Sequence, residues 1–383
     1  SFEMNKKSIY DLISPAILVD IDHVEKNISE MAVRAKEGGV SLRPHIKTHK
    51  CIEIGKMQLD AGAQGITAST LAEALAFADE GFDDITYAVP LSPDKFPGVR
   101  KVSERTHLSI LVDHPIIVDR LGDFCKRNKF SLDVLVKVNC GYPRTGIDPK
   151  TPAAISLVRK IHETPYLRFK GILTHAGHSY DKSTLTEIKT VARQEQEVMI
   201  QFADTLKAEN KALKPEVVSI GSTPTVRLAD SFQEGVTEIR PGNYVFFDYT
   251  QVALGSCDIS DCALTVLSSV ISVNPDRVVI DAGATALSKD TGPTHIESNV
   301  GYGKLFKNYQ KSQLNTNVIL KALSQEHGKI IPVDGADIEY KHGDRVRILP
   351  NHSCLTANLF DQYHIVEGET VVNRWKVHRE RFE

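Results

Sequence analysis

The stretch Ser41–Lys50 gathers five basic or imidazole side chains, and Lys47 lies among them. A lysine at the mouth of a strand, surrounded by cations, can have a lowered pKa and act as a neutral amine. Such an amine can form a Schiff base with an aldehyde cofactor. A solvated basic loop at a strand end is the alternative interpretation, because most lysines lie on protein surfaces.

Four later loops carry polar groups directly after predicted strands: Asn139–Gly146 with Arg144, Thr174–Tyr180, Gly221–Thr225 and Arg240–Tyr244. The last two contain glycine and offer hydroxyl and backbone N–H donors, which suit a phosphate group. Gly221–Thr225 is equally typical of a helix start capped by Ser or Thr. A phosphate site together with a reactive amine fits pyridoxal phosphate as the cofactor.

A second candidate centre is the pair His352 and Cys354, in the segment Leu349–Cys354. Two residues apart on an extended segment, an imidazole and a thiolate point to the same face. Together they form a ligand pair for Zn²⁺ and leave further positions for water or substrate. A core cysteine beside a surface histidine would produce the same short motif.

Two further groups have an open role. The stretch Ser324–Gly328, with Gln325 and His327, is either a hydrogen-bonding substrate loop or a turn. His175 and His178 could bind a ligand or could be structural histidines at a strand end. Their spacing differs from that of the HExxH metal helix.

Short apolar strands alternate with amphipathic helices in the first two thirds of the chain, which favours βαβ units and a parallel sheet. Nine strands are predicted, one more than a (β/α)₈ barrel needs, so we assign the first to another domain. The predicted strands are Ala16–Ile21, Ser41–Ile46, Gly65–Ser69, Ile85–Val89, Leu108–Val112, Asp133–Asn139, Phe169–His175, Val217–Gly221 and Thr237–Arg240.

Helices are predicted over His23–Lys36, Thr70–Glu80 and Ser183–Lys211. Thr70 and Glu73 have the spacing of a capping box at the second of these. If the barrel starts with Ser41–Ile46, Lys47 lies at the carboxyl end of its first strand. That face carries the chemistry in (β/α)₈ barrels.

The pattern changes near Asp248, after which helical periodicity is scarce and an antiparallel β domain is expected. Its predicted strands are Ala263–Val273, Arg277–Ala282, Val333–Asp334, Arg345–Leu349 and His364–Glu367. The fold class is therefore α/β, with a (β/α)₈ barrel over residues 22–250. The antiparallel β domain comprises residues 1–21 and 251–383.

The composition of the 383 residues, 41% hydrophobic and 25% charged with a net charge of −3, is that of a soluble globular protein. No basic excess indicates nucleic acid as a partner, and no apolar run reaches the ~18 residues of a membrane span. The first seven residues are polar and lack the apolar core of a signal peptide. Six scattered cysteines without disulfide spacing fit a reducing cytoplasm.

Three motifs, Pro44–Lys50, Thr174–Gly177 and Pro350–Cys354, give the chain a family resemblance. In this order they resemble the D-serine dehydratase and D-threonine aldolase family. These are fold-type III pyridoxal phosphate enzymes related to alanine racemase, and the resemblance covers nearly the whole chain. It implies that the N-terminal strand returns to the β domain, which agrees with the surplus strand. It also implies a homodimer.

The resemblance implies a role for each site residue. Lys47 corresponds to the Schiff-base lysine, Arg144 to an arginine near the pyridine ring, and His352 and Cys354 to the metal ligands. Gln325 and His327 become candidate substrate residues. The cofactor pocket, mostly around the phosphate, would comprise His175, Tyr180, Gly221, Ser222, Thr223, Gly242, Asn243 and Tyr244.

Cys354 separates two activities within this family. Dehydratases resemble this chain in having His-x-Cys, whereas aldolases more typically have His-x-Asp, which suits harder ions such as Mn²⁺ or Mg²⁺. We therefore expect a zinc-dependent dehydratase that converts a D-β-hydroxy amino acid, such as D-serine, to the oxo acid and ammonia, with Lys47 also removing the Cα proton. The alternatives are a metal-dependent D-threonine aldolase and a non-catalytic protein of cofactor homeostasis.

Overall fold

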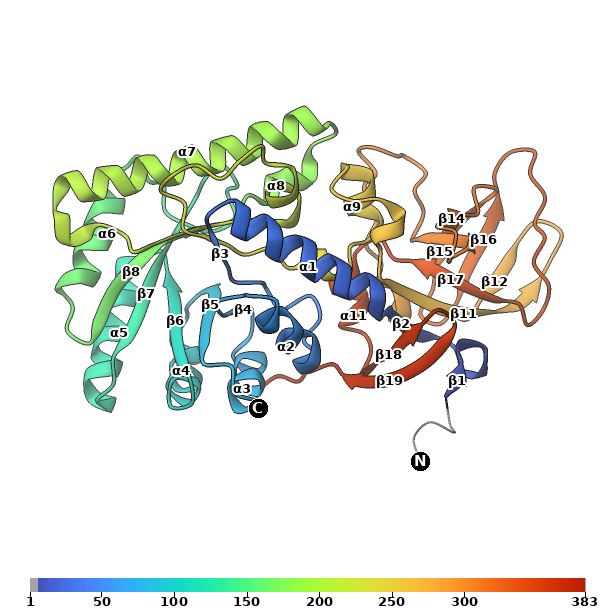
Figure 1. Ribbon diagram of the computed structural model, residues 1–383, viewed down its shortest axis with the longest axis horizontal. Helices are drawn as coiled ribbons and strands as arrows, with labels where there is room; N and C mark the ends of the chain where they lie inside the picture. The colour runs from blue at the N-terminus through green and yellow to red at the C-terminus, as the bar shows by residue number, and fades with distance from the viewer. Residues whose placement is uncertain (1–5, 383) are drawn as a thin grey trace. The chain divides into compact units, whose positions relative to one another are not determined.

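The computed structural model describes residues 6–382, so most of the polar N-terminal stretch lies outside the described residues. The chain forms two compact units. Residues 31–242 and 379–383 make the first, here named the barrel unit, and residues 1–30 and 243–378 make the second, the sheet unit. Relative to the predicted domains, residues 22–30 and 243–250 are grouped with the antiparallel sheet. Figure 1 shows the barrel unit in light blue to green.

Eight parallel strands form the sheet of the barrel unit, in the order β3-β10-β9-β8-β7-β6-β5-β4. An isolated parallel bridge between His45 and Thr67 joins the two ends of this order. The eight strands predicted for the barrel are all present, as β3 (Ser41–Leu42), β4 (Ile66–Ala68), β5 (Asp84–Pro90), β6 (His107–Val112), β7 (Leu132–Val138), β8 (Leu167–Thr174), β9 (Val217–Ile220) and β10 (Glu238–Ile239).

Strand β3 is shorter than the predicted Ser41–Ile46, because Pro44 has no N–H to donate toward β4. The extended path nevertheless continues. Arg43 N donates to Ile239 O at 2.9 Å, and Thr67 N donates to Pro44 O at 2.9 Å. The loop that carries Lys47 therefore starts at the carboxyl end of the first barrel strand, as predicted.

Helices separate the parallel strands and lie outside the curled sheet (Figure 1). The predicted capping box is confirmed at the start of α3 (Leu71–Asp79), where Thr70 Oγ1 accepts from Glu73 N and Glu73 Oε1 accepts from Thr70 N. The other helices of eight or more residues are α1 (Ile21–Glu37), α2 (Ile52–Asp60), α4 (Phe96–Ser103), α5 (Pro115–Asn128), α6 (Pro152–Glu163) and α7 (Leu185–Glu209).

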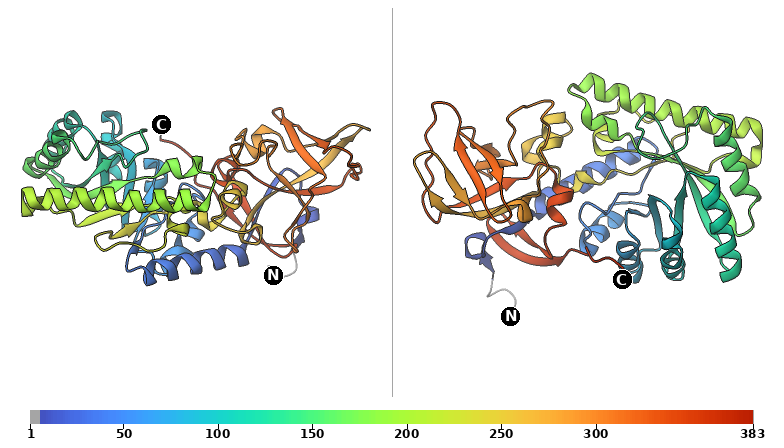
Figure 2. Two further views of the ribbon diagram at one scale, coloured as in Figure 1. Left: turned by 90° about the horizontal axis from the view of Figure 1, so that it is seen from above. Right: turned by 180° about the vertical axis from the view of Figure 1, so that it is seen from behind.

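The sheet unit confirms that the first predicted strand leaves the barrel. Strand β2 (Ala16–Asp20) pairs antiparallel with β11 (Leu264–Val273) and parallel with β18 (Gln362–Glu367). Figure 2 shows the dark blue N-terminal strands among the orange and red strands of this unit. A strand from the start of the chain thus lies between two strands from its end. The remaining strands are β1 (Lys7–Ser8), β12 (Val278–Ile280), β13 (Lys304–Asn308), β14 (Gln313–Leu314), β15 (Val318–Leu323), β16 (Gly328–Pro332), β17 (Arg345–Leu349) and β19 (Thr370–Lys376).

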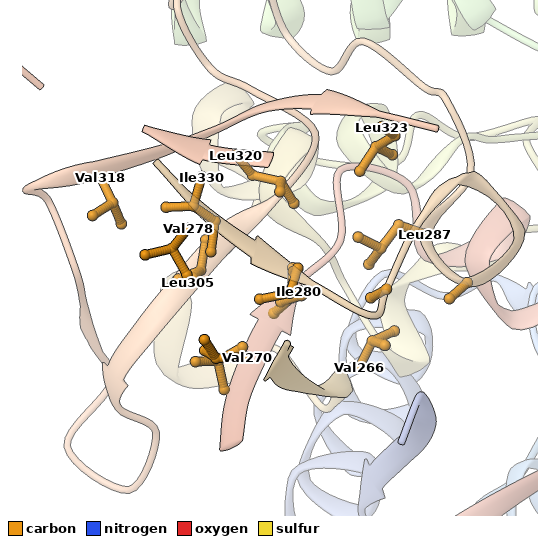
Figure 3. Packing of buried hydrophobic residues seen from close by; sticks show 14 residues of the cluster. Val266, Val270, Val278, Ile280, Leu287, Leu305, Val318, Leu320, Leu323 and Ile330 are labelled. Carbon is orange, nitrogen blue, oxygen red and sulfur yellow. The ribbon is translucent and has the colours of Figure 1, made fainter. Parts of the chain in front are cut away.

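The core of the sheet unit consists of aliphatic side chains from several of these strands (Figure 3). Val266, Ile280, Leu320 and Ile348 have no exposed surface. The predicted strand Val333–Asp334 is wrong, because β16 ends at Pro332 and the chain turns at Gly335, whose φ is +76°.

Several strands were not predicted: β13, β15, β16 and β19 mix lysine or arginine with apolar residues, which obscures the alternation. Among the described residues no helix is both long and apolar enough to cross a membrane.

Candidate active site

Lys47 lies in the turn that follows the His45 bridge, and its side chain is exposed. Its backbone N–H donates to His45 Nδ1 at 3.3 Å, and Lys50 N closes the turn onto Ile46 O at 2.7 Å. The loop after β10 passes very near: a Cβ on Gly242 would lie 2.9 Å from the His45 carbonyl oxygen. Only glycine therefore allows this approach beside the lysine loop.

Two imidazoles near Lys47 are held in the neutral form. Burial is the main cause that lowers the pKa of both His45 and His175 well below the ordinary value, and the charge of Lys47 adds to it. His175 Nδ1 lies 3.1 Å from Gly221 O, and since a carbonyl only accepts, Nδ1 carries the proton. These histidines therefore add polarity to the site without adding charge.

Lys137, on β7, is a buried cation directed at the same end of the barrel. Burial and the charges of Arg240 and Arg144 lower its pKa to about 7. Arg240 is buried as well, where its guanidinium donates to Ser219 Oγ at 2.7 Å and to Thr174 O at 2.6 Å. Together with Lys47, these cations give the carboxyl ends of the strands a positive field that suits an anionic cofactor.

The turn after β9 has the features of a phosphate cradle. Gly221 has a φ of +130°, and a Cβ there would lie 3.0 Å from Arg240 N. Ser222 caps the short helix α8 (Thr223–Leu228), which confirms the helix-start interpretation. Thr223 Oγ1 is buried without a hydrogen-bond partner in the protein, which leaves a donor for a ligand oxygen. The two interpretations of this segment are therefore compatible.

Glu195, on α7, lies behind this turn and was not predicted. Its Oε2 accepts from Gly221 N at 3.3 Å, and hydrogen bonds to Ala176 N–H and Thr225 also favour its anion. Burial nevertheless raises the pKa of Glu195 to about 7. This one carboxyl group joins the loops that follow β8 and β9.

An aromatic cluster stands over the loop that follows β7. Tyr142 stacks on His178 with ring centroids 6.2 Å apart, and the Arg144 guanidinium lies 5.2 Å from the Tyr142 ring centroid. Gly177 makes room for this ring, since a Cβ there would lie 2.3 Å from Tyr142 Cε1. Tyr180 lies in the loop that follows β8, as Gly177 does, and is half-buried. Arg144 itself is exposed.

Asn243 and Tyr244 follow Gly242 in the chain and are buried in the sheet unit. Asn243 Nδ2 donates to Asp248 Oδ2 at 2.8 Å and lies 3.9 Å from Cys354 Sγ. Asp248 also accepts from Ser353 N at 2.9 Å and Gln251 N at 3.0 Å, although burial raises its pKa. Asp248 therefore fixes the backbone between the two predicted metal ligands.

His352 and Cys354 lie together, but the extended segment predicted for them is wrong. His352 is the extended N-cap of helix α11 (Ser353–Ala357), and Cys354 lies in the first turn of that helix. The segment turns here because Asp248 and Phe247 O accept hydrogen bonds from Ser353. Burial opposes the imidazolium of His352, but hydrogen bonds to Asp290 and Cys354 outweigh it and raise its pKa to about 11.

The imidazole of His352 thus lies between the Asp290 carboxylate and Cys354, a position that also suits a metal cation. Among the described residues no three or more His, Cys, Asp or Glu side chains converge on one metal position. A site with two protein ligands leaves coordination positions for water and substrate, as a catalytic site requires. The buried Asn243 Oδ1, next to Cys354, has no protein partner and is a further polar atom at this place. The residues present fit a zinc ion.

Gln325 and His327 lie in the exposed turn between β15 and β16. The turn packs on the start of α10 (Ala284–Leu287), where Thr285 Oγ1 donates to Gln325 O at 3.0 Å. The Cβ of any residue replacing Gly283 would lie 2.4 Å from Gln325 O. The turn interpretation is confirmed, and the substrate role of the two side chains stays a prediction.

Four residues of the two centres were missed in the sequence: Lys137, Glu195, Asp248 and Asp290. Tyr142 and Arg240 lay in predicted site loops but had no role assigned to them. Lys137 lies in a predicted strand and Arg240 at the end of one. A charged residue inside an otherwise apolar strand could have indicated a functional site. Glu195 and Asp290 carry no local pattern, because their partners are distant in the chain.

Comparison with known proteins agrees with this fold. Residues 19–250 match the family model of the alanine racemase N-terminal domain, and residues 263–366 match that of a serine dehydratase domain. D-serine dehydratase from Dictyostelium discoideum is 37% identical over 97% of this chain and 98% of its own length. D-threo-3-hydroxyaspartate dehydratase from Delftia sp. is 35% identical over 96% and 98%, respectively.

A solved structure of the Delftia enzyme superposes with a TM-score of 0.90 at 33% identity, and covers 98% of this chain and 100% of that one. D-threonine aldolase from Arthrobacter is a more distant relative, 27% identical over 95% of this chain and 92% of its own. Alanine racemase from Clostridium difficile, with a TM-score of 0.68 at 14% identity, shares the fold.

The fold and these matches define the class of fold-type III pyridoxal phosphate enzymes. Within that class, the chain belongs to the D-serine dehydratase family, together with D-threo-3-hydroxyaspartate dehydratase. It is a pyridoxal phosphate-dependent lyase. These curated relatives, which cover 95–97% of this chain, are enzymes, so the non-catalytic alternative is rejected.

Proposed function

We propose that this protein is a zinc- and pyridoxal phosphate-dependent dehydratase that converts a D-β-hydroxy amino acid, such as D-serine, to the oxo acid and ammonia. The observation that carries the proposal is the pairing of His352 with Cys354 beside Asp290. A thiolate is a soft ligand that favours zinc over magnesium or manganese. Two relatives that are at least 35% identical to this chain are dehydratases.

The residues of the barrel unit would hold the cofactor. Lys47 would bind its aldehyde carbon, and Gly221, Ser222, Thr223 and Gly242 would receive its phosphate. Support comes from the strained glycine turn, from the unpartnered Thr223 hydroxyl and from the surrounding cations. His175, Tyr180, Asn243 and Tyr244 would complete the pocket, with Arg144 near the ring.

Lys47 would also take the proton from the substrate's Cα. To do so its amine must be neutral, and neighbouring cations such as Lys137 and Arg240 favour the neutral form. When bound, pyridoxal phosphate stabilises negative charge at Cα, and zinc polarises the β-oxygen so that it leaves more readily. His352 and Cys354 would hold the metal, while Gln325 and His327 would contact the substrate.

Mutant structures of a D-threo-3-hydroxyaspartate dehydratase support the metal role. Solved structures of D-threo-3-hydroxyaspartate dehydratase include one histidine-to-alanine mutant, and one cysteine-to-alanine mutant in a metal-free form. The two mutated positions of that enzyme are two residues apart, the spacing of His352 and Cys354. The pair in this chain is therefore the place where we expect its metal.

The second candidate is a D-3-hydroxy amino acid aldolase, which would use the same groups to break the Cα–Cβ bond. This candidate is supported by aldolase relatives that are 27% identical over 95–96% of this chain. Manganese or magnesium would then be the expected metal, although Cys354 is a poor ligand for either.

A substrate panel tests the proposal directly. The protein, supplied with pyridoxal phosphate and zinc, is incubated with D-serine, D-threonine and D-3-hydroxyaspartate. An oxo acid with ammonia is expected, and exhaustive chelation should abolish its formation until zinc is restored. Glycine with an aldehyde would instead establish the aldolase, and full activity after complete metal removal would contradict the metal step.

We further infer a cytoplasmic homodimer. The six cysteines form no disulfide, and five of them are buried, which suits a reducing compartment. The homodimer rests on the family resemblance, and light scattering of the purified protein would test it by giving about twice the chain mass of 42.4 kDa.

A further inference from the structure

The loop between α10 and β13 carries a carboxylate that faces the proposed metal ligand. Asp290 Oδ2 lies 3.3 Å from His352 Nδ1. A carboxylate can only accept, so Nδ1 must carry the hydrogen of this bond. In a neutral imidazole, the lone pair is then on Nε2, the nitrogen that remains for a metal ion.

The loop holds Asp290 in place without help from His352. Gly292 N donates to Asp290 Oδ1 at 2.8 Å, and Asp290 N donates to Ser288 Oγ at 3.3 Å. Asn351 Nδ2 donates to Asp290 O at 3.0 Å. Because Oδ1 is engaged by the backbone, Oδ2 is the oxygen directed at the imidazole.

Asn351 ties this arrangement to the metal-ligand segment, since it directly precedes His352. Its Nδ2 also donates to Gly301 O at 2.9 Å. Gly292 has a φ of +70°, and a Cβ there would lie 2.8 Å from Asn351 Cγ. The loop and the segment are therefore packed closely, and backbone contacts hold Asp290 near His352.

A second acidic residue on the same connection has different partners. Glu297 accepts from Lys304 Nζ at 2.9 Å and from Tyr249 Oη at 2.7 Å. Both residues would contribute negative charge, but of the two only Asp290 contacts the imidazole of His352. Glu297 is thus a matched control.

We propose that Asp290 is a positioning residue that fixes the tautomer and ring orientation of His352 and thereby sets the affinity for zinc. This inference rests on the metal site of the proposed function. Carboxylate partners of metal-binding histidines act in this way, and their loss typically weakens metal binding by about 10- to 100-fold.

Zinc affinity of the full chain provides the test. After chelation, zinc is titrated into wild-type protein, Asp290→Ala, Asp290→Asn and Glu297→Gln in competition with a chromogenic chelator. We expect Asp290→Ala to weaken zinc binding by roughly 10- to 100-fold. Asp290→Asn keeps an acceptor oxygen and the turn geometry, so its loss should be smaller, and Glu297→Gln should match the wild type.

His352→Ala in the same titration separates the two possible failures. If wild type and His352→Ala bind zinc equally, the metal site itself is wrong, and with it the role of Asp290. If wild type binds more tightly than His352→Ala but Asp290→Ala binds within twofold of wild type, the metal site stands and the positioning role is overturned. If Asp290→Ala does not fold, the zinc affinity of Asp290→Asn is compared with that of wild type in its place.

Discussion

Lys47 has an exposed amine, and its neighbours His45 and His175 are imidazoles whose surroundings favour the neutral form. His45 and His175 have lowered pKa values because they are buried beside Lys47 and other cations. The chemistry therefore depends on a local surplus of positive charge at the strand ends, which an anionic cofactor would neutralise. Replacing the side chain that reacts should therefore have a different effect from replacing one that only supplies charge.

Lys47→Ala should abolish the cofactor's absorbance band that arises from its bond to the lysine, while leaving the fold intact because the side chain is exposed. The measurement is an absorbance spectrum of the protein reconstituted with pyridoxal phosphate, together with its thermal transition. Lys56→Ala, an exposed lysine of the barrel unit that pairs with Glu80, is the control and should keep the band. An unchanged band in Lys47→Ala would refute the covalent role.

Glu195 makes the stability of the barrel unit depend on pH. Burial raises its folded pKa from the ordinary 4.5 to about 7, so the folded state keeps a proton that the unfolded state loses. The free energy of unfolding therefore falls as pH rises from about 4.5 to about 7, by on the order of 3 kcal/mol, and is level above that range.

Glu195→Gln should remove this dependence, because the amide does not titrate and can still accept from Gly221 N. Urea unfolding at pH 5 and pH 8 measures it: relative to wild type, the variant should gain stability at the higher pH. Glu197→Gln changes an exposed residue on the same helix and should behave as wild type. If the unfolding free energies of wild type and Glu195→Gln differed by the same amount at pH 5 and pH 8, Glu195 would not be the source of the pH dependence.

The starts of helices α9 and α11 share one carboxylate, that of Asp248. Asp248 is the N-cap of α9 (Tyr249–Leu254), and it also accepts from Ser353 N in the first turn of α11. Because α11 carries Cys354, the geometry of the metal pair depends on a residue more than one hundred positions earlier in the chain.

Asp248→Ala would leave three buried donors without an acceptor, from Gln251, Ser353 and Asn243. Each unmet buried donor costs about 1–3 kcal/mol, so we expect a loss of roughly 3 kcal/mol or more in unfolding free energy. Urea unfolding measures it, with Asp248→Asn expected between the alanine variant and wild type. Asp276→Ala, at an exposed aspartate of the sheet unit, should cost almost nothing, and an equal loss there would contradict this account.

The sheet unit is assembled from both ends of the chain. Leu18, in β2, has no exposed surface and pairs with Thr265 of β11 and His364 of β18. Strand β2 is therefore an interior strand of this sheet, and the sheet combines strands from both ends of the chain.

Leu18→Asp would bury a charge in the middle of the sheet and should cost about 4 kcal/mol or more, enough to unfold the unit. The readouts are solubility and the thermal transition followed by circular dichroism. Ile13→Asp makes the same change a few residues earlier, where the side chain is 92% exposed, and should be nearly silent. Equal transitions for the two variants would show that β2 does not hold the sheet together.

Local patterns in the chain predicted the alternation of strands and helices, the capping box at Thr70 and Glu73, and the loops that carry Lys47 and Gly221. Each of these depends on residues within one helix turn or one strand of each other, where periodicity and capping are visible in the chain. The surplus strand was also recognised by counting, because a closed barrel takes eight.

The distant residues that support the site are evident only from the folded chain. His352 meets Asp290 across 62 positions, Asp248 meets Ser353 across 105, and β2 meets β11 across about 250 residues. No local pattern encodes such pairs, because the free energy that forms them comes from burial and hydrogen bonding after the chain has folded. The turn of His352 and Cys354 into a helix start is the same kind of effect, since Asp248 and Phe247 impose it from outside the motif.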